Sequence, residues 1–184
     1  MAAWFALFAT HPPARAEDVT ILNIILGKPL TIPECVRNQN GGYKILSRDR
    51  TCWTRDRYVK DSPGMWLSPK EEAQLQFIRQ PIYLELRGKN VDAIKIITNG
   101  ISVQETAFST LEDKFGKPTS ANVDEVQNRF GATFSVYRAQ WTKPGIIVEF
   151  EGAYESLDSG RIEIMTKQYK NNRDAARAAA KPKL

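Results

Sequence analysis

Hydrophobic and polar positions in the second half of the chain predict one helix followed by three strands. The S-V-Q-E sequence at 102–105 is typical of a capping box, and Gly116 and Pro118 predict the end of the helix. Residues 134–141, 146–151 and 161–166 are predicted strands separated by turn-rich segments. The apolar stripe of the helix comprises Val103, Ala107, Phe108, Leu111 and Phe115. Three successive strands after one helix predict an antiparallel meander with that helix packed on one face.

The first half of the chain shows weaker patterns. Residues 20–26 suit a short strand or turn, and residues 82–86 and 91–98 are predicted strands around a turn at 88–90. Ser68 is a predicted helix N-cap followed by proline, although Pro81 limits that helix to a short one. The predicted fold class is therefore α+β, an antiparallel β-sheet (meander) with one main helix packed on one face.

The N-terminal residues resemble a signal for export. In residues 1–16 an apolar run precedes two prolines and an Ala-Arg-Ala site, which predicts a signal peptide cleaved before Glu17. No basic residue precedes the apolar run, and a frayed N-terminus of an intracellular protein is the alternative. No apolar run reaches the ~18 residues of a transmembrane helix. These features predict a periplasmic or secreted protein whose residues 17–166 form a single domain.

Removal of residues 1–16 also removes the only histidine, His11. A chain without histidine lacks a Ser–His or Cys–His pair and a His-ligated metal, and two cysteines are too few for a structural zinc site. We therefore expect no metal, no cofactor and no enzymatic activity. A carboxylate-based hydrolase using Glu149, Glu151 or Glu163 is a weaker hypothesis, because their alternation with apolar residues is better explained as the solvent face of a sheet.

The two cysteines, Cys35 and Cys52, are too far apart for a redox C-x-x-C motif. In an exported protein they predict one intramolecular disulfide, with a free reactive thiol as the alternative.

Positive charge is concentrated in two segments. Residues 167–184 contain six basic residues and one acidic residue, are rich in alanine, and predict a flexible tail or a marginal helix. We interpret this tail as a solvated end rather than a binding arm. Residues 36–60 contain seven basic and two acidic residues, with aromatic residues between them.

Arginine beside exposed aromatic residues is enriched at recognition surfaces. The candidate binding residues are Arg48, Arg50, Trp53, Arg55, Arg57, Tyr58 and Trp66. The alternative is a strand that buries Trp53 and Tyr58 in the core while its arginines face water. Nucleic-acid binding is disfavoured by predicted export and by the absence of a recognition motif.

Five segments are distinctive: GKPLTIPEC (27–35), ITNGISVQETAFSTLEDKFGKPT (97–119), AQW (139–141), the V-x-F strand (148–150) and GRIEIMT (160–166). Together they resemble a family of small exported proteins of Gram-negative bacteria whose function is not established. The order of elements is more distantly similar to outer-membrane assembly lipoproteins and β-lactamase inhibitor protein, which bind other proteins. A lipid-acceptor cysteine near residue 17 is absent.

These observations predict a non-enzymatic periplasmic binding or adaptor module that engages a protein partner in the cell envelope. The alternative is a binder of an anionic envelope ligand, a lipid headgroup or a wall fragment, through the basic disulfide-bounded loop.

Overall fold

A computed structural model describes residues 20–36, 50–55 and 62–180 of the chain. The elements of its first half are β1 (Thr20–Ile21), β2 (Ile24–Ile25), β3 (Cys52–Thr54), β4 (Gly64–Trp66), α1 (Pro69–Gln74), β5 (Ile78–Arg87) and β6 (Asn90–Thr98). The second half contains η1 (Gly100–Val103), α2 (Gln104–Phe115), β7 (Ser120–Gln127), β8 (Thr133–Thr142), β9 (Ile146–Ser156), β10 (Ser159–Thr166) and α3 (Lys167–Ala180). The predicted signal peptide lies outside the described residues.

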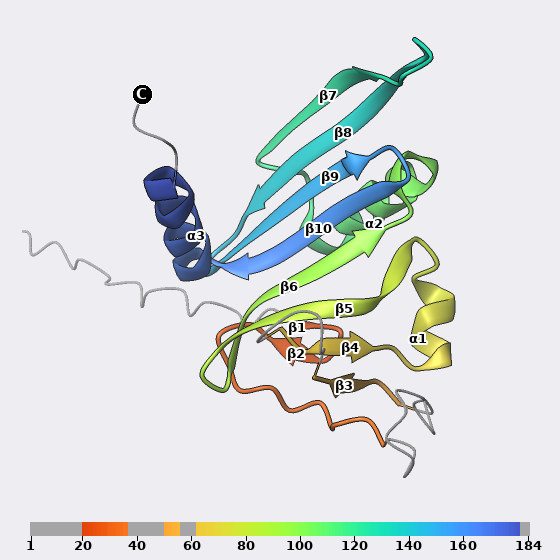
Figure 1. Cartoon of the computed structure of the whole chain (residues 1–184). Helices are drawn as coiled ribbons and strands as arrows, with labels where there is room; N and C mark the ends of the chain where they lie inside the picture. The colour runs from red at the N-terminus through yellow and green to blue at the C-terminus, as the bar shows by residue number, and fades with distance from the viewer. Residues whose placement is uncertain (1–19, 37–49, 56–61, 181–184) are drawn as a thin grey trace, which may run out of the picture.

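The main sheet has eight strands in the order β3-β4-β5-β6-β10-β9-β8-β7, and each neighbouring pair is antiparallel (Figure 1). The last strand, β10, pairs with β6 at the centre and so joins the two halves of the chain. The predicted α+β class is confirmed, as are the predicted meander and the strands of the second half. Residues 20–26 form the small β1–β2 hairpin instead of a single strand.

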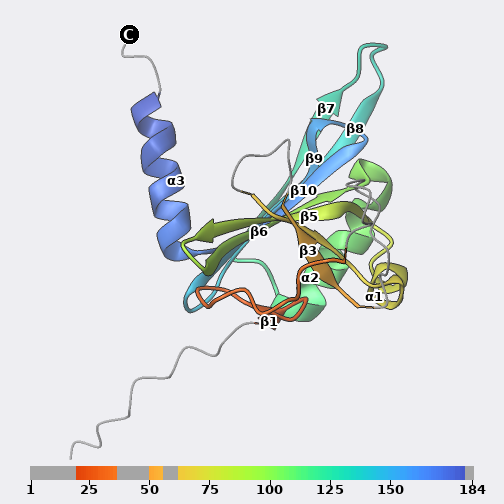
Figure 2. The same ribbon diagram turned by 60° about the horizontal axis from the view of Figure 1, so that its bottom comes forward.

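The hydrophobic core lies between the sheet and α2. Buried residues of β6, β9 and β10, such as Ile94, Phe150 and Ile162, pack with Ala107 and Leu111 of α2. Figure 2 shows α2 and α3 on opposite sides of the sheet. The main helix thus covers one face, as its apolar stripe predicts.

The two helix starts differ in how closely they follow the sequence patterns. At α1, Ser68 is the N-cap and proline follows it, as predicted, and Ser68 also forms a complete capping box with Glu71. At α2 the predicted capping box is absent, because residues 100–103 form a 3-10 turn and the Ser102 hydroxyl donates to the Asn99 carbonyl instead. The predicted helix is therefore correct in position but begins differently.

The opposite face of the sheet carries charged residues, and the C-terminal helix packs against it. Tyr169 of α3 contacts a small cluster formed by Ala93, Ile147 and Met165. No helix within the described ranges has both the length and the hydrophobicity needed to cross a membrane.

Candidate functional site

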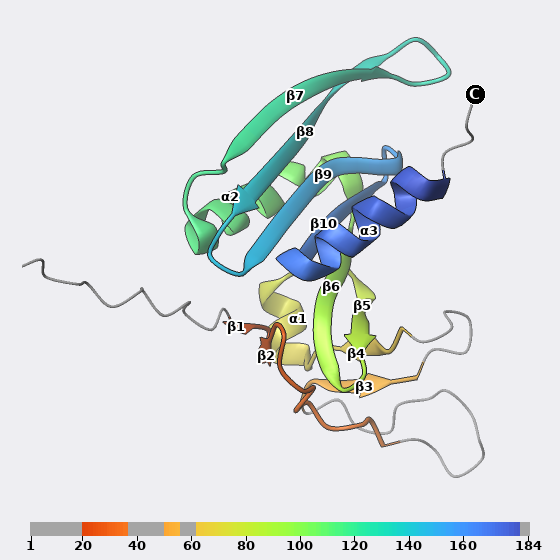
Figure 3. The ribbon, with the colours of Figure 1, turned by 90° about the vertical axis from the view of Figure 1, so that its left-hand side faces the viewer.

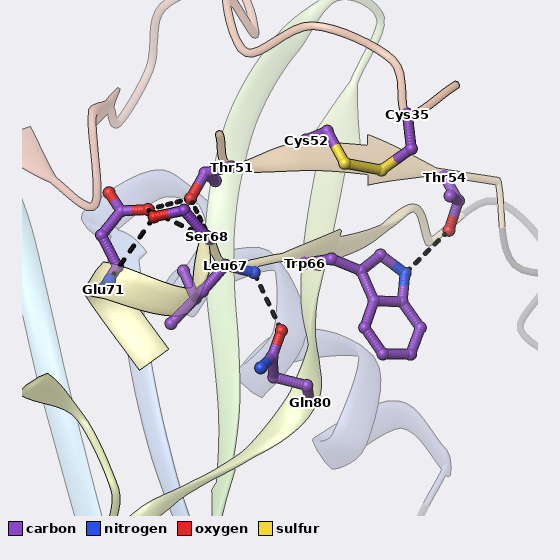
Figure 4. The surroundings of a disulfide bond; sticks show 9 residues. All are labelled: Cys35, Thr51, Cys52, Thr54, Trp66, Leu67, Ser68, Glu71 and Gln80. Carbon is purple, nitrogen blue, oxygen red and sulfur yellow. Dashed lines mark hydrogen bonds between the residues drawn. A yellow bond between two sulfur atoms is a disulfide. The ribbon is translucent and has the colours of Figure 1, made fainter. Parts of the chain in front are cut away.

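The predicted disulfide is confirmed and organises one end of the sheet. Cys35 and Cys52 are bonded with their Cα atoms 4.9 Å apart, and both are buried (Figure 4). The Cys35 N–H donates to the Trp53 carbonyl (2.9 Å), and the Trp53 N–H donates to the Pro33 carbonyl (3.0 Å). The segment before Cys35 therefore covers the outer edge of β3.

The predicted basic and aromatic site is only partly described. Arg48, Arg57 and Tyr58 lie outside the described residues. Arg50 and Arg55 are exposed, whereas Trp53 is half-buried and packs against the core.

Trp66 lies opposite Cys52 on β4 and is also half-buried. Its indole N–H donates to the Thr54 hydroxyl (3.2 Å; Figure 4). Both tryptophans therefore have a structural contact, and each keeps part of its ring accessible.

A cavity of about 620 Å³ lies beside this end of the sheet. Arg50 and Lys70 line it, together with Glu71 from the first turn of α1. Burial alone would raise the pKa of Glu71, but hydrogen bonds from Thr51 and Ser68 hold that pKa below its ordinary value. Glu71 is thus a fixed carboxylate beside the two cations.

The polar face of the sheet and α3 together form a second cavity, a charged groove. The groove has a volume of about 320 Å³, and its lining residues come from β7, β8, β9, β10 and α3. Its charged lining residues are Arg138, Glu149, Glu151, Arg161, Lys170, Arg173, Asp174 and Arg177.

The centre of this network is Arg173 on α3. Its Nη2 lies 2.8 Å from Glu149, and its Nη1 pairs with Glu163. Glu163 is only 3% exposed, and the side chain of Arg173 only 11%. The expected solvent face is therefore wrong for Glu163, because α3 covers this carboxylate and supplies its counter-ion.

The ion pairs of Glu149 favour the charged form of this carboxylate. Burial disfavours the charged form of Glu149, but hydrogen bonds from Arg173 and Lys170 outweigh it and hold the pKa of Glu149 below 4.5. The pKa of Lys170 is raised above 10.5, first by its hydrogen bond to Asp174. A general acid needs a raised carboxyl pKa, so these shifts run against acid catalysis at Glu149.

The β7–β8 hairpin reaches beyond the rest of the sheet (Figure 3). Residues 120–127 of β7 pair with 133–140 of β8, but β9 pairs with β8 only from Arg138 to Thr142. The outer half of the hairpin therefore has no neighbouring described strand on the β9 side.

Gln104 supports the hairpin at the point where β8 leaves β9. This buried side chain donates to the Ser135 carbonyl (2.9 Å) and accepts from the Tyr137 N–H (3.0 Å). It satisfies two backbone groups of β8 that lie beyond the pairing with β9. Gly152 of β9 makes room for it, because a Cβ there would lie 2.1 Å from the Gln104 Oε1.

Large apolar side chains are exposed on this hairpin. Phe130 at its tip is 95% exposed, and Val123 on β7 is 59% exposed. The third exposed large apolar residue in the described ranges, Val36, lies next to the disulfide. A cavity of about 230 Å³ beside Val123 is lined by Phe108 and Tyr137, whose rings stack edge to face.

No family model, curated protein or solved structure matches this chain. The described part of the chain contains no group of three or more His, Cys, Asp or Glu residues that could hold a metal ion.

The sequence patterns missed both the groove and β7. The groove depends on α3 folding back over the polar face, and the S-A-N-V-D-E-V-Q sequence of β7 lacks a buried alternating face. One available signal was the row of acidic residues on β9 and β10 followed by basic residues at helical spacing from Lys170 to Arg177.

Proposed function

We propose that the protein is a non-enzymatic binding module that engages a protein partner through its β7–β8 hairpin, in the periplasm or outside the cell. The observation that carries this proposal is the projecting hairpin with an exposed apolar tip. Two of the three large apolar side chains that are exposed in the described ranges, Phe130 and Val123, lie on this hairpin, and aromatic residues are enriched at protein–protein interfaces.

Other features support the same proposal. The disulfide fits an oxidising compartment. The support of β8 by Gln104 holds the hairpin in place before any partner arrives, which lowers the entropy lost on binding.

The proposal is tested by capture from a cell-envelope extract on the immobilised protein. We expect a partner that the wild type retains and that the double variant Val123→Ser, Phe130→Ser loses. The matched control is Val36→Ser, which removes an equally exposed valine at the opposite end of the sheet and should retain the partner. Retention by the hairpin variant, or loss from the Val36 variant, would place binding elsewhere.

A second candidate function is binding of an anionic envelope ligand at the disulfide end. The specific observation is that Arg50 and Lys70 line one cavity, with exposed Arg55 nearby on the chain. Reversing the charges of Arg48, Arg50, Arg55 and Arg57 should then weaken binding of vesicles that contain anionic lipid. Binding that does not change with salt concentration would count against this candidate.

A further inference from the structure

We propose that β7 binds an extended segment of the partner by strand addition, and that this segment alternates apolar with basic residues. This inference rests on the proposed function, because it names the mode of binding and the chemistry of the partner at the same hairpin. It is carried by the open edge of β7 and by the different chemistry on the two sides of that strand.

The two edges of the eight-stranded sheet differ. β3 is three residues long and is covered by the segment before Cys35. β7 is eight residues long, pairs with β8 without a register shift, and has no described segment on its outer side. It contains neither proline nor lysine, which natural edge strands use to prevent pairing with other chains.

The hydrogen bonds around the hairpin show which backbone groups of β7 point outward. The Asn128 N–H donates to the Ala132 carbonyl across the hairpin, whereas the backbone of Ser135 and Tyr137 points away from β7 toward Gln104. Hydrogen-bond direction alternates along an antiparallel strand. The N–H and C=O groups of Ala121, Val123, Glu125 and Gln127 are therefore directed to the open edge.

The side of β7 that faces α2 is apolar near Val123. Val123 and Ala121 line the 230 Å³ cavity together with Phe108 and Tyr137. An added strand would place every second side chain over this cavity, because directly opposite residues on neighbouring strands are in contact. Apolar side chains are the ones that gain from burial there.

The outer half of β7 carries two acidic residues. Asp124 lies on the groove side, where its carboxylate is 2.5 Å from Arg138, whereas the exposed Glu125 lies on the opposite side of the strand, the side of Val123. Opposite charges across neighbouring strands stabilise a sheet, and like charges oppose pairing. A segment that places its apolar side chains over the cavity therefore carries lysine or arginine on its other side, beside Asp124.

The same charges disfavour a second copy as the occupant. Two β7 strands paired antiparallel about their outer halves would bring Asp124 and Glu125 of each copy together. We therefore commit to a segment of a different protein, and the oligomeric state of the free chain is measured as part of the test.

The probe is a capped peptide of alternating valine and lysine, long enough to span β7 and used at concentrations where it is monomeric. We expect saturable binding, with slowed hydrogen exchange at the amides of Ala121, Val123, Glu125 and Gln127. The same peptide with glutamate in place of lysine should bind about tenfold more weakly. Equal affinity for both peptides, or slowed exchange confined to other strands, would overturn the proposal.

A matched pair of variants tests the backbone contribution. Val123→Pro removes an outward backbone N–H but none of the hydrogen bonds to β8. Val123→Thr keeps this backbone N–H and has a side chain of similar shape. We expect the proline variant to lose the peptide and the threonine variant to retain it. Undiminished binding by a folded proline variant contradicts strand addition; if that variant fails to fold, the exchange pattern of the wild type decides.

The outcomes separate this inference from the proposed function. In one outcome, partner capture requires the side chains of Val123 and Phe130 while hydrogen exchange at the outward amides is not slowed. That result would support the hairpin as the binding surface and overturn strand addition. A free chain that is dimeric, with its outward amides already protected, would contradict the choice of a different protein as occupant.

Discussion

Gln104 and Gly152 show how single residues hold the projecting hairpin. The Gln104 amide occupies the space between β8 and β9, and its two hydrogen bonds replace those that a neighbouring strand would make. Gly152 is required because any side chain there would enter that space. The pair therefore links α2 to the shape of the proposed binding surface.

We predict that Gly152→Ala and Gln104→Ala each destabilise the protein by about 1–3 kcal/mol. The alanine at 152 displaces the Gln104 amide, and the alanine at 104 leaves the Ser135 carbonyl and the Tyr137 N–H unpaired. Because both substitutions act through the same contact, the double variant should lose much less unfolding free energy than the sum of the two single losses, as measured by urea unfolding. Additive losses would mean that the two residues act independently.

Secondary-structure elements differ in how far sequence patterns predict them. The apolar stripe of α2 and the strands around it are predicted because each buries one face, from Ala107 on the helix to Ile162 on β10. The β7 strand is exposed at an edge and carries no such alternation, so its role could not be inferred before its pairing with β8 was known.

The C-terminal helix illustrates a second reason why sequence patterns do not predict every part of the structure. The alanine-rich sequence after Lys167 predicts a marginal helix or a tail, and the structure has α3 over Lys167–Ala180. The contact between Arg173 and Glu163 joins residues on two different elements, so spacing along the chain does not specify it. Half of the charged groove therefore could not be predicted.

We predict that Arg173→Ala lowers the free energy of unfolding by about 2–4 kcal/mol, because it leaves the buried Glu163 and the half-buried Glu149 without their shared counter-ion. Arg177→Ala is the control, since Arg177 lies one turn further along the same helix and is exposed. Arg177→Ala should change the free energy of unfolding by no more than ~0.5 kcal/mol in the same urea measurement. Equal effects of the two variants would show that α3 is not held by this contact.

The groove also predicts an acid-dependent loss of stability. The pKa of Glu149 is lower in the folded protein than its ordinary 4.5, so its contribution is complete above that pH and is lost as the pH falls through the folded value. Asp174 and Glu71 have lowered pKa values too and add to the same trend. The urea concentration at the unfolding midpoint, measured between about pH 7 and pH 3, should decrease once the pH is below 4.5. This decrease should be less steep for Glu149→Gln. A variant that follows the wild-type curve would show that Glu149 contributes nothing.

At the scale of the whole molecule, the sheet has two ends with different roles in this account. The disulfide, the short β3 strand and the segment over it close one edge. The hairpin at the other end has an exposed apolar tip, and no described segment pairs with its outer edge. Of the basic and aromatic residues that the sequence favoured, the four described ones lie at the closed end, where Trp53 and Trp66 are half-buried and Arg50 and Arg55 are exposed.

The most direct test of the central claim is hydrogen–deuterium exchange of the protein with and without its captured partner. The account predicts slowed exchange across 120–142, with the strongest effect at the outward amides of β7, and unchanged exchange at 50–55 and 62–66. Protection at 50–55 and 62–66 with an unaffected hairpin would contradict the account and place the partner at the disulfide end.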